Sequence, residues 1–553
     1  MKPLLICLIL LIFFFPTTNG QQWQWAKGAG TGFAGIATDN YGHIYSGGAF
    51  RNASITFGEI TLPNAGTDST EDIFIVKYDT SGYVLWAHRA GGIYIEETSA
   101  LTTDVAGAVY IGGITYSDTI IFDTITLSFT GTSSNNMFLA KYDSSGHVVW
   151  AKNFGGGDIG GDIDPESISV DALGNVYVSG VFSSTWVTFG TTTLSNSTGA
   201  PMFLVKFSPS GNVVWAKAVQ GGAGYYVSSD IDTMGHIYVT GTFGGTVSFD
   251  AISLFSNGSN DMFLAKYDTS GNVIWAKNYG TPDAEYGNNL TTEISGNVFI
   301  SGFFHGPSFP LGPDILVNSY SPITDYYLVK LDSSGNVVWA RNSIGPGNVG
   351  LAGVAVDHSD NVYTTARFVG STITFGHDTL HNSNPGNFAI FVTKYDALGN
   401  NIWSTGPTGI AGTSSGGIAI NSYGQVYITG AILGPALYIA DTTFTGSYRG
   451  EYFIARLDTA LHHTNSLPAI IGRKNGINIF PNPNTGKLTV QLNTTGVTGL
   501  QIYDCLARQL YTTILTGTEN TTQIELQNIS SGLYYLHATG SAHNENIPFV
   551  VSR

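Results

Sequence analysis

A repeated pair of sequence phrases constrains this chain more than any other feature. The first phrase is MFLAKYDSSGHVVWAK at residues 137–152, and close copies occupy 202–217 and 262–277. The second lies about 30 residues after each and reads ISVDALGNVYVSGVF at 168–182. Its turn residue recurs at Asp39, Asp104, Asp171, Asp232, Glu293, Asp357 and Asn421, about 64 residues apart on average. A period of this length with several strands in each repeat favours a ring of small sheets over a helical solenoid.

The local pattern of each repeat predicts four strands. Segments such as VYVSGVF and FLAKYD alternate in polarity and are rich in Val, Tyr and Phe, as strands are. The Asp-x-x-Gly-Asn pieces between them suit hairpin turns, because Asp binds its own turn backbone and Gly accepts a positive φ. The sequence therefore predicts an all-β fold, with each repeat forming one propeller blade.

The number of blades follows from two sets of repeated residues. Seven tryptophans mark the outer strands and seven cations mark the third strands, but the two sets are out of phase along the chain. We predict a seven-bladed β-propeller over residues 21–458, in which the N-terminal strand around Trp25 completes the last blade and leaves no open edge. We expect the tryptophans to pack between neighbouring sheets; they are Trp25, Trp86, Trp150, Trp215, Trp275, Trp339 and Trp403.

The Asp-x-x-Gly-Asn-Val-Tyr-x-x-Gly and Lys-Tyr-Asp-x-x-Gly-Asn-Val-x-Trp-Ala-Lys units resemble those of the bacterial SBBP repeat family. That resemblance implies a β-propeller and no single activity. The turn is also similar to the repeat of quinone-dependent dehydrogenase propellers, which have eight blades and a vicinal Cys pair. Only Cys505 remains after the first 20 residues, so no cofactor of that kind is expected.

The chain carries 22 Lys and Arg against 39 Asp and Glu, a net charge of −17. This balance disfavours nucleic acid and anionic membranes as partners. Residues 1–20 have a positive start, a short apolar core and small residues at the end, which predicts a signal peptide rather than a membrane anchor. No later apolar run reaches the ~18 residues that a spanning helix needs.

The composition changes after residue 458. Residues 459–475 are predicted to be a linker, and 476–553 a small β-sandwich of Ig-like type. This segment resembles the C-terminal sorting domain of type IX secretion in Bacteroidetes, through Pro481, Asn482, Pro483, Gly486, Tyr503, Asp504, Gly532 and Tyr534. The resemblance implies passage through the type IX machinery to the outer surface or the medium, with cleavage near residue 476. A binding domain of Ig type without a targeting role is the alternative.

Candidate binding residues lie in the loops between repeats. The short Asp-x-x-Gly turns occupy one face of such a ring, and the long, variable connections occupy the other, where binding residues usually concentrate. The candidates on the variable face are Glu96, Glu97, Asp158, Asp162, Asp164, Glu166, Tyr225, Tyr226, Asp283, Glu285 and Tyr286. The aspartates Asp158, Asp162 and Asp164 could bind calcium in a Gly-rich loop, but their spacing does not match an EF-hand, and a solvated acidic loop is the favoured explanation.

These observations favour a secreted or cell-surface propeller that binds a polysaccharide or a protein without catalysis. An enzyme is the first alternative, because paired loop carboxylates can hydrolyse or cleave glycosides when they lie at about 5–10 Å. A purely structural component of the cell envelope is the second.

Overall fold

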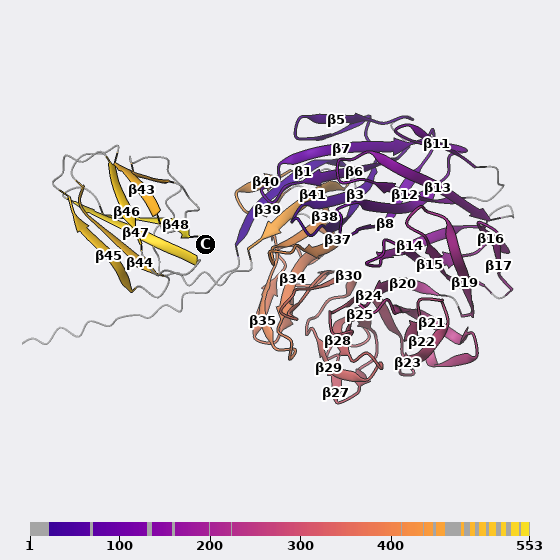
Figure 1. Cartoon of the computed structure of the whole chain (residues 1–553). Helices are drawn as coiled ribbons and strands as arrows, with labels where there is room; N and C mark the ends of the chain where they lie inside the picture. The colour runs from indigo at the N-terminus through magenta and orange to yellow at the C-terminus, as the bar shows by residue number, and fades with distance from the viewer. Residues whose placement is uncertain are drawn as a thin grey trace, which may run out of the picture. The chain divides into compact units, whose positions relative to one another are not determined.

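The computed structural model describes residues 22–458 and 477–551, with gaps at 32, 67–69, 130–134, 157–160, 198, 223, 411, 435, 446–449, 481–486, 493–496, 505–507, 516–520, 527–531 and 541–543. The chain divides into an N-terminal body, Met1–His462, and a C-terminal body, His463–Arg553. Every regular element among the described residues is a β-strand (Figure 1). No helix in this part of the chain has the length and hydropathy needed to cross a membrane.

The described strands of the N-terminal body form seven four-stranded antiparallel groups, which we call repeat sheets 1 to 7. Sheet 1 contains β2 (Phe33–Thr38), β3 (Ile44–Phe50), β6 (Asp72–Tyr78) and β7 (Val84–Gly91). Sheet 2 contains β8 (Glu96–Thr103), β9 (Val109–Thr115), β12 (Asn136–Tyr142) and β13 (Val148–Gly156). Sheet 3 contains β14 (Ile163–Val170), β15 (Val176–Phe182), β18 (Met202–Phe207) and β19 (Val213–Gly221). Sheet 4 contains β20 (Tyr225–Ile231), β21 (Ile237–Phe249), β22 (Ile252–Tyr267) and β23 (Val273–Tyr279).

The remaining three sheets repeat this pattern. Sheet 5 contains β24 (Glu285–Thr292), β25 (Val298–Phe304), β28 (Asp325–Leu331) and β29 (Val337–Asn342). Sheet 6 contains β30 (Val349–Val356), β31 (Val362–Phe368), β34 (Ala389–Tyr395) and β35 (Asn401–Thr405). Sheet 7 contains β37 (Gly412–Ile420), β38 (Val426–Leu433), β41 (Glu451–Leu457) and β1 (Trp23–Thr31).

Sheet 7 joins the two ends of the N-terminal body. Strand β1 pairs antiparallel with β41, with Ala26 opposite Ala455, and the Asp458 N–H donates to the Gln22 carbonyl at 2.9 Å. The first strands of the sheets contact one another in order, from β2 through β8, β14, β20, β24 and β30 to β37, and β37 contacts β2. The sheets therefore form a closed, propeller-like ring around their first strands.

A small hairpin is inserted between the second and third strands of each sheet. Six of these hairpins, among the described residues, have strands of their own: β4 (Ser54–Phe57) with β5 (Ile60–Pro63), β10 (Thr119–Phe122) with β11 (Ile125–Ser128), β16 (Trp186–Phe189) with β17 (Thr192–Ser195), β26 (Ser308–Leu311) with β27 (Asp314–Val317), β32 (Thr372–Phe375) with β33 (Asp378–His381), and β39 (Leu437–Ile439) with β40 (Thr442–Phe444). Strand β10 also pairs with β7 of sheet 1, and β16 with β13 of sheet 2. In sheet 4 the hairpin is an extension of β21 and β22. Strand β36 (Thr408–Gly409) pairs with β39.

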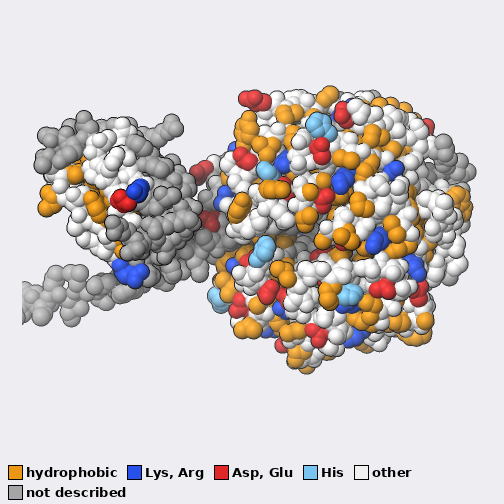
Figure 2. All heavy atoms as spheres, viewed as in Figure 1, with side chains coloured by type: hydrophobic (Ala, Val, Ile, Leu, Met, Phe, Trp, Pro, Cys, Tyr) orange, Lys and Arg blue, Asp and Glu red, His pale blue; other side chains and the backbone are white. Residues whose placement is uncertain are grey.

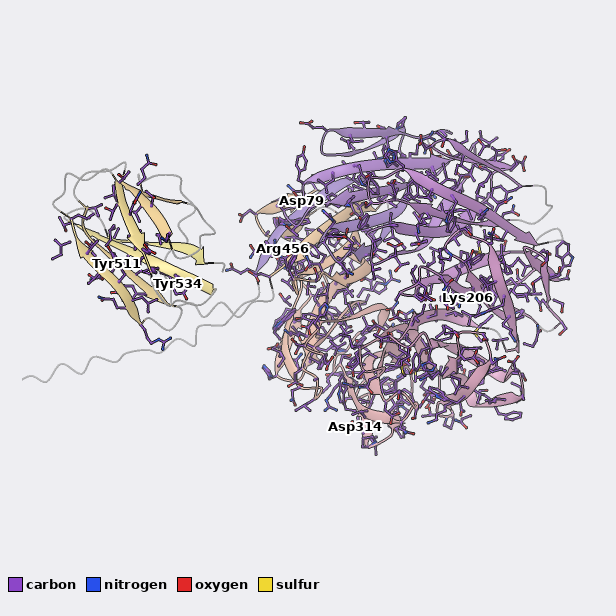
Figure 3. All side chains as sticks on the ribbon, in the orientation of Figure 1. Asp79, Lys206, Asp314, Arg456, Tyr511 and Tyr534 are labelled. Carbon is purple, nitrogen blue, oxygen red and sulfur yellow. The ribbon has the colours of Figure 1, made fainter. Side chains whose placement is uncertain are left out.

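The repeated residues tie each sheet to the next. In sheet 1, the Lys77 ammonium lies 5.0 Å from the centre of the Tyr45 ring and donates to the Ser144 carbonyl of sheet 2 at 2.9 Å. The Trp86 indole N–H donates to the same carbonyl at 3.2 Å. In the same way, Arg456 and Trp25 of sheet 7 both donate to the Thr80 carbonyl, close to Asp79 (Figure 3). Lysine and tryptophan thus link neighbouring sheets through one backbone oxygen.

The described strands of the C-terminal body form two sheets that share one core. The first contains β42 (Ile477–Phe480), β43 (Lys487–Leu492) and β46 (Thr521–Glu525); the second contains β44 (Val497–Asp504), β45 (Gln509–Ile514), β47 (Gly532–Gly540) and β48 (Asn544–Val551). Leu488 and Val490 of the first sheet and Ile502 and Leu536 of the second are buried in this core. The two sheets therefore pack face to face as a small sandwich.

Candidate functional site

The first strands of all seven sheets line a central cavity of about 490 Å³. Its polar lining comes mainly from Ser, Thr and Asn side chains, and its two ionisable lining residues are Glu166 and Asp230. Asp230 is occupied by the backbone N–H of Thr292 at 2.8 Å and the hydroxyl of the same residue at 3.0 Å. Glu166 is therefore the charged group in the cavity with capacity left for a ligand.

Glu166 occupies a β-bulge, because the pairing of β14 with β15 shifts register between Pro165 and Ser167. A bulge turns a side chain away from its regular direction, here toward the cavity. The carboxylate accepts the N–H of Val227 in sheet 4. Burial is the main cause that raises the pKa of Glu166 to about 7; the Val227 N–H opposes the rise and the nearby Asp164 adds to it. Glu166 thus holds a proton near neutral pH.

Two further carboxylates, Asp164 and Glu97, lie near Glu166 but are not among the cavity-lining residues. Asp164 accepts the amide N–H of Asn135 at 3.2 Å. The pKa of Glu97 is raised by partial burial and then by the carboxylates Glu71 and Asp164, while Arg51 opposes the rise. The pKa of Asp164 is likewise raised by burial. Sheets 2 and 3 therefore bring three of the predicted acidic residues together.

Aromatic side chains lie at the same end of sheets 4 and 5. Tyr226 is 37% exposed, and its ring centre is 6.0 Å from Tyr286 and 5.9 Å from Phe303. Tyr286 stacks on Phe303 at 4.7 Å. Tyr226 has a φ of 58°, a left-handed conformation that a bulky residue adopts at a cost of about 1–3 kcal/mol. Strain of this kind concentrates at ligand-binding positions.

Arg367 is a site residue that the sequence argument missed. It is half-buried on β31, its guanidinium lies 4.3 Å from the centre of the Phe388 ring, and it donates to the Ser414 hydroxyl at 3.1 Å. Burial raises the pKa of the Tyr226 hydroxyl, the charges of Tyr286 and Glu166 add to the rise, and the Arg367 charge opposes it. The only signal in the sequence is one difference between repeats. Residues 362–368, VYTTARF, have Arg367 at the position where residues 176–182, VYVSGVF, have Val181.

Other predicted residues have different surroundings. Glu96 is fully buried and accepts the Gly92 N–H and the Thr115 hydroxyl, both at 2.8 Å. Glu285 is buried in the same way and accepts the Thr281 N–H at 2.8 Å and its hydroxyl at 2.5 Å. Both carboxylates cap their own loops and are already occupied. Asp162 and Asp283 lie in the loops before β14 and β24 and are not among the cavity-lining residues.

Some predicted residues cannot be placed. Asp158 and the side chain of Tyr225 lie outside the described part of the chain, as do Pro481, Asn482, Pro483, Gly486 and the side chain of Asp504. Gly532 begins β47, Tyr503 lies on β44, and Tyr534 is buried in the core of the C-terminal body. Within the described residues, no group of three His, Cys, Asp or Glu side chains is arranged to hold a metal ion.

Comparison with known families bears on the C-terminal body. Residues 478–552 match the secretion system C-terminal sorting domain. This match confirms the resemblance predicted from the sequence and indicates a protein that leaves the cell or stays at its outer surface.

Relatives of the N-terminal body are distant. An uncharacterised WD repeat-containing protein of Acanthamoeba polyphaga mimivirus is 24% identical over 517 residues, covering 76% of this chain and 37% of that protein. This chain thus spans little more than a third of that relative's length. Among solved structures, an apocarotenoid oxygenase of Synechocystis has a TM-score of 0.35 at 9% identity, covering 80% of this chain and 93% of the other. A subtype N10 neuraminidase-like protein of A/little yellow-shouldered bat/Guatemala/060/2010 has a TM-score of 0.33 at 9% identity, covering 78% of this chain and 99% of the other.

Proposed function

We propose that this chain is exported through type IX secretion to the cell surface or the medium, after a signal peptide at residues 1–20 has directed it to the periplasm. The sorting-domain match at residues 478–552 supports this route. Deleting residues 478–552 is expected to retain the protein in the periplasm. Secretion of the truncated chain at the level of the full chain would refute the route.

The seven repeat sheets are the blades of a seven-bladed β-propeller over residues 21–458, and the C-terminal sandwich, residues 476–553, is an Ig-like sorting domain joined by the linker 459–475. The closed circle of contacts from β2 to β37 and back supports the blade count. Mass spectrometry of secreted material is expected to show a chain that ends near residue 476.

The propeller binds a polysaccharide through the entrance of its central cavity. One observation carries this proposal: Tyr226 is held exposed at a positive φ beside a stacked aromatic pair, next to a carboxyl at the cavity wall. Aromatic faces pack on the apolar faces of sugar rings, and the surrounding Asn, Ser and carboxyl groups can bind hydroxyls. A protein ligand at this face is the alternative.

Glycan-array binding tests the proposal. Tyr226→Ala is expected to lower the affinity for a bound glycan at least 10-fold, while Tyr226→Phe keeps most of it, because the ring provides the contact. Tyr438→Ala is the matched control, since Tyr438 is 47% exposed on a hairpin distant in sequence. Glycan binding that is unchanged in Tyr226→Ala would remove this site from the proposal.

Catalysis on a glycoside is the second candidate. A carboxyl that holds its proton near neutral pH can act as a general acid beside an ionised carboxylate, and Glu166 lies next to Asp164. Hydrolysis of a polysaccharide panel that is abolished by Glu166→Gln, with glycan binding retained, would establish an enzyme. Binding without turnover would leave the binding function alone.

A further inference from the structure

A ring of exposed apolar side chains lies on the face opposite the proposed glycan site. Each repeat sheet has an inner turn, between its first and second strands, at residues 39–42, 104–107, 171–174, 232–235, 293–296, 357–360 and 421–424. Six of the seven carry one large apolar residue that is 60–81% exposed: Tyr41, Val105, Leu173, Met234, Ile294 and Tyr423. The seventh turn carries His358, which is also exposed.

The outer turns, between the third and fourth strands, show that the fold does not require these residues. They have the same bend: the Gly82 N–H donates to the Asp79 carbonyl at 3.0 Å, as the Gly42 N–H does to the Asp39 carbonyl at 3.0 Å. Their central residues are nevertheless small or polar in five of six cases, namely Thr80-Ser81, Ser144-Ser145, Pro209-Ser210, Thr269-Ser270 and Ser333-Ser334, with Ala397-Leu398 as the exception. Apolar residues are thus concentrated at the inner turns although the turn geometry accepts polar ones equally well.

The inner turns touch one another, so their apolar residues form one surface. The Ser422 hydroxyl donates to the Asn40 carbonyl at 3.0 Å, and the Thr233 hydroxyl donates to the Ile294 carbonyl at 3.3 Å. The Tyr423 ring covers Gly42 of the next sheet so closely that a Cβ there would lie 2.4 Å from it. A contiguous exposed apolar patch on a monomer marks an interaction site.

Charged residues around the ring of inner turns limit the kind of partner that can bind there. Lys77 reaches both the inner-turn Asp39, at 3.9 Å, and the outer-turn Ser144 carbonyl, so inner and outer turns share one face. Five outer turns begin with an aspartate: Asp79, Asp143, Asp268, Asp332 and Asp396. The repeated cations are shielded, as the side chains of Lys77 and Lys266 are only 6% and 10% exposed. Lys277 and Arg341 reach the outer turns of the next sheets and offset the charges of Asp332 and Asp396. The face is therefore apolar at its centre, with anionic stretches around it at Asp79, Asp143 and Asp268. On the visible face of this body, acidic, basic and histidine side chains are scattered among hydrophobic and other side chains (Figure 2).

This charge pattern excludes two occupants. A second copy of the same face would set carboxylates against carboxylates, and an anionic membrane would be repelled in the same way. A polypeptide with apolar side chains flanked by Lys or Arg complements both zones.

We propose that the ring of inner turns docks a protein partner through a segment that presents apolar side chains flanked by Lys or Arg. This second interaction surface is independent of the glycan site, because it lies at the other ends of the first strands.

The probe is a synthetic 14-residue amphipathic peptide of Leu and Lys, compared with a peptide in which Glu replaces every Lys. Binding to the full chain is measured by fluorescence anisotropy. The ring variant combines Tyr41→Ser, Leu173→Ser, Met234→Ser and Tyr423→Ser. The control variant combines Phe255→Ser, Ile315→Ser, Val317→Ser and Tyr438→Ser, whose side chains are 47–67% exposed on the inserted hairpins. Both variants keep every charge, and tryptophan fluorescence verifies that each is folded.

The Leu–Lys peptide is expected to bind the wild type and the control variant equally, and the ring variant at least 10-fold more weakly, while the Leu–Glu peptide binds none of them. Equal binding by the ring and control variants would overturn the proposal, as would binding of the Leu–Glu peptide. A wild-type dimer in analytical ultracentrifugation that the ring variant loses would identify a second copy as the occupant and also overturn it. Glycan binding is measured in parallel, so that an effect on the ring of inner turns can be distinguished from an effect on the glycan site.

Discussion

In six of the seven repeat sheets the tryptophan packs on the outer-turn glycine of the next sheet, and a pair of Gly→Ala substitutions isolates this contact. Gly211 ends the turn Ser208–Gly211 and Gly424 ends the turn Asn421–Gly424; both have the same N–H to carbonyl hydrogen bond across the turn, and their φ angles are 77° and 74°. A Cβ on Gly211 would lie 3.0 Å from ring carbons of Trp150, whereas a Cβ on Gly424 would meet no heavy atom within 4 Å. The two substitutions therefore share the backbone effect and differ in the contact with the next sheet.

The difference in stability can be worked out from these geometries. A side chain in the left-handed region costs about 1–2 kcal/mol, and the loss of unfolded-state freedom offsets about 0.4–1 kcal/mol of it. Gly424→Ala is thus expected to destabilise by about 1 kcal/mol. Gly211→Ala adds the overpacking of a close-packed interface, about 1–3 kcal/mol, because the rigid indole at 3.0 Å must move. The expected total is about 2–4 kcal/mol.

Urea unfolding followed by tryptophan fluorescence measures both values. All nine tryptophans lie before residue 404, so the signal reports the N-terminal body alone. Gly211→Ala is also made in a Trp150→Leu background, which lacks the indole. The destabilisation caused by Gly211→Ala is then expected to fall to that caused by Gly424→Ala. Equal destabilisation by the two single substitutions, or an undiminished cost in the Trp150→Leu background, would refute the reasoning.

Three further predictions concern ionisation, strain and closure. Asp325 is 1% exposed; burial raises its pKa to about 7 and the Asn342 side chain opposes the rise, so the contribution of Asp325 to stability is present below pH 4 and lost as pH rises through 7. Asp325→Asn is therefore expected to gain stability over the wild type between pH 4 and pH 8, by as much as about 4 kcal/mol in thermal or urea unfolding, and a pH-independent gap would contradict this. Tyr226→Gly is expected to be about 1 kcal/mol more stable than Tyr226→Ala, since both lose the ring and only Gly accepts a positive φ without strain, while glycan binding is lost in both; a Gly variant no more stable than the Ala variant would show that position 226 is not strained. Removal of residues 22–31 is expected to expose the edge of β41 and lower the unfolding midpoint, and a synthetic peptide of those residues should restore it; an unchanged midpoint would show that β1 does not stabilise the ring.

The sequence predicts most of the strand structure because local chemistry determines it. Alternating apolar residues and an Asp-x-x-Gly turn specify each hairpin without help from distant residues. Where sheet 6 has Asp360 in place of the turn glycine, Asp takes the same left-handed conformation, with a φ of 59°, as its short polar side chain permits. The pairing of β1 with β41 also follows from the repeat. The last repeat lacks a fourth strand and the chain begins with an extra strand, so the two complete one sheet.

The composition of the candidate site depends on tertiary structure. Glu96 and Glu97 are adjacent and chemically alike, yet successive strand residues face opposite sides, so Glu96 caps a loop from inside the protein and Glu97 lies within electrostatic reach of Asp164. Glu166 faces the cavity because the bulge between Pro165 and Ser167 changes its direction, and no local pattern in the sequence marks that bulge. Arg367 joins the site only because sheet 6 lies beside sheet 7 in a closed ring. The sequence by itself determined the repeat, the strands and the turns, which depend on neighbours along the chain. Only the tertiary structure decided which side chains share the cavity, because that depends on seven sheets meeting at one axis.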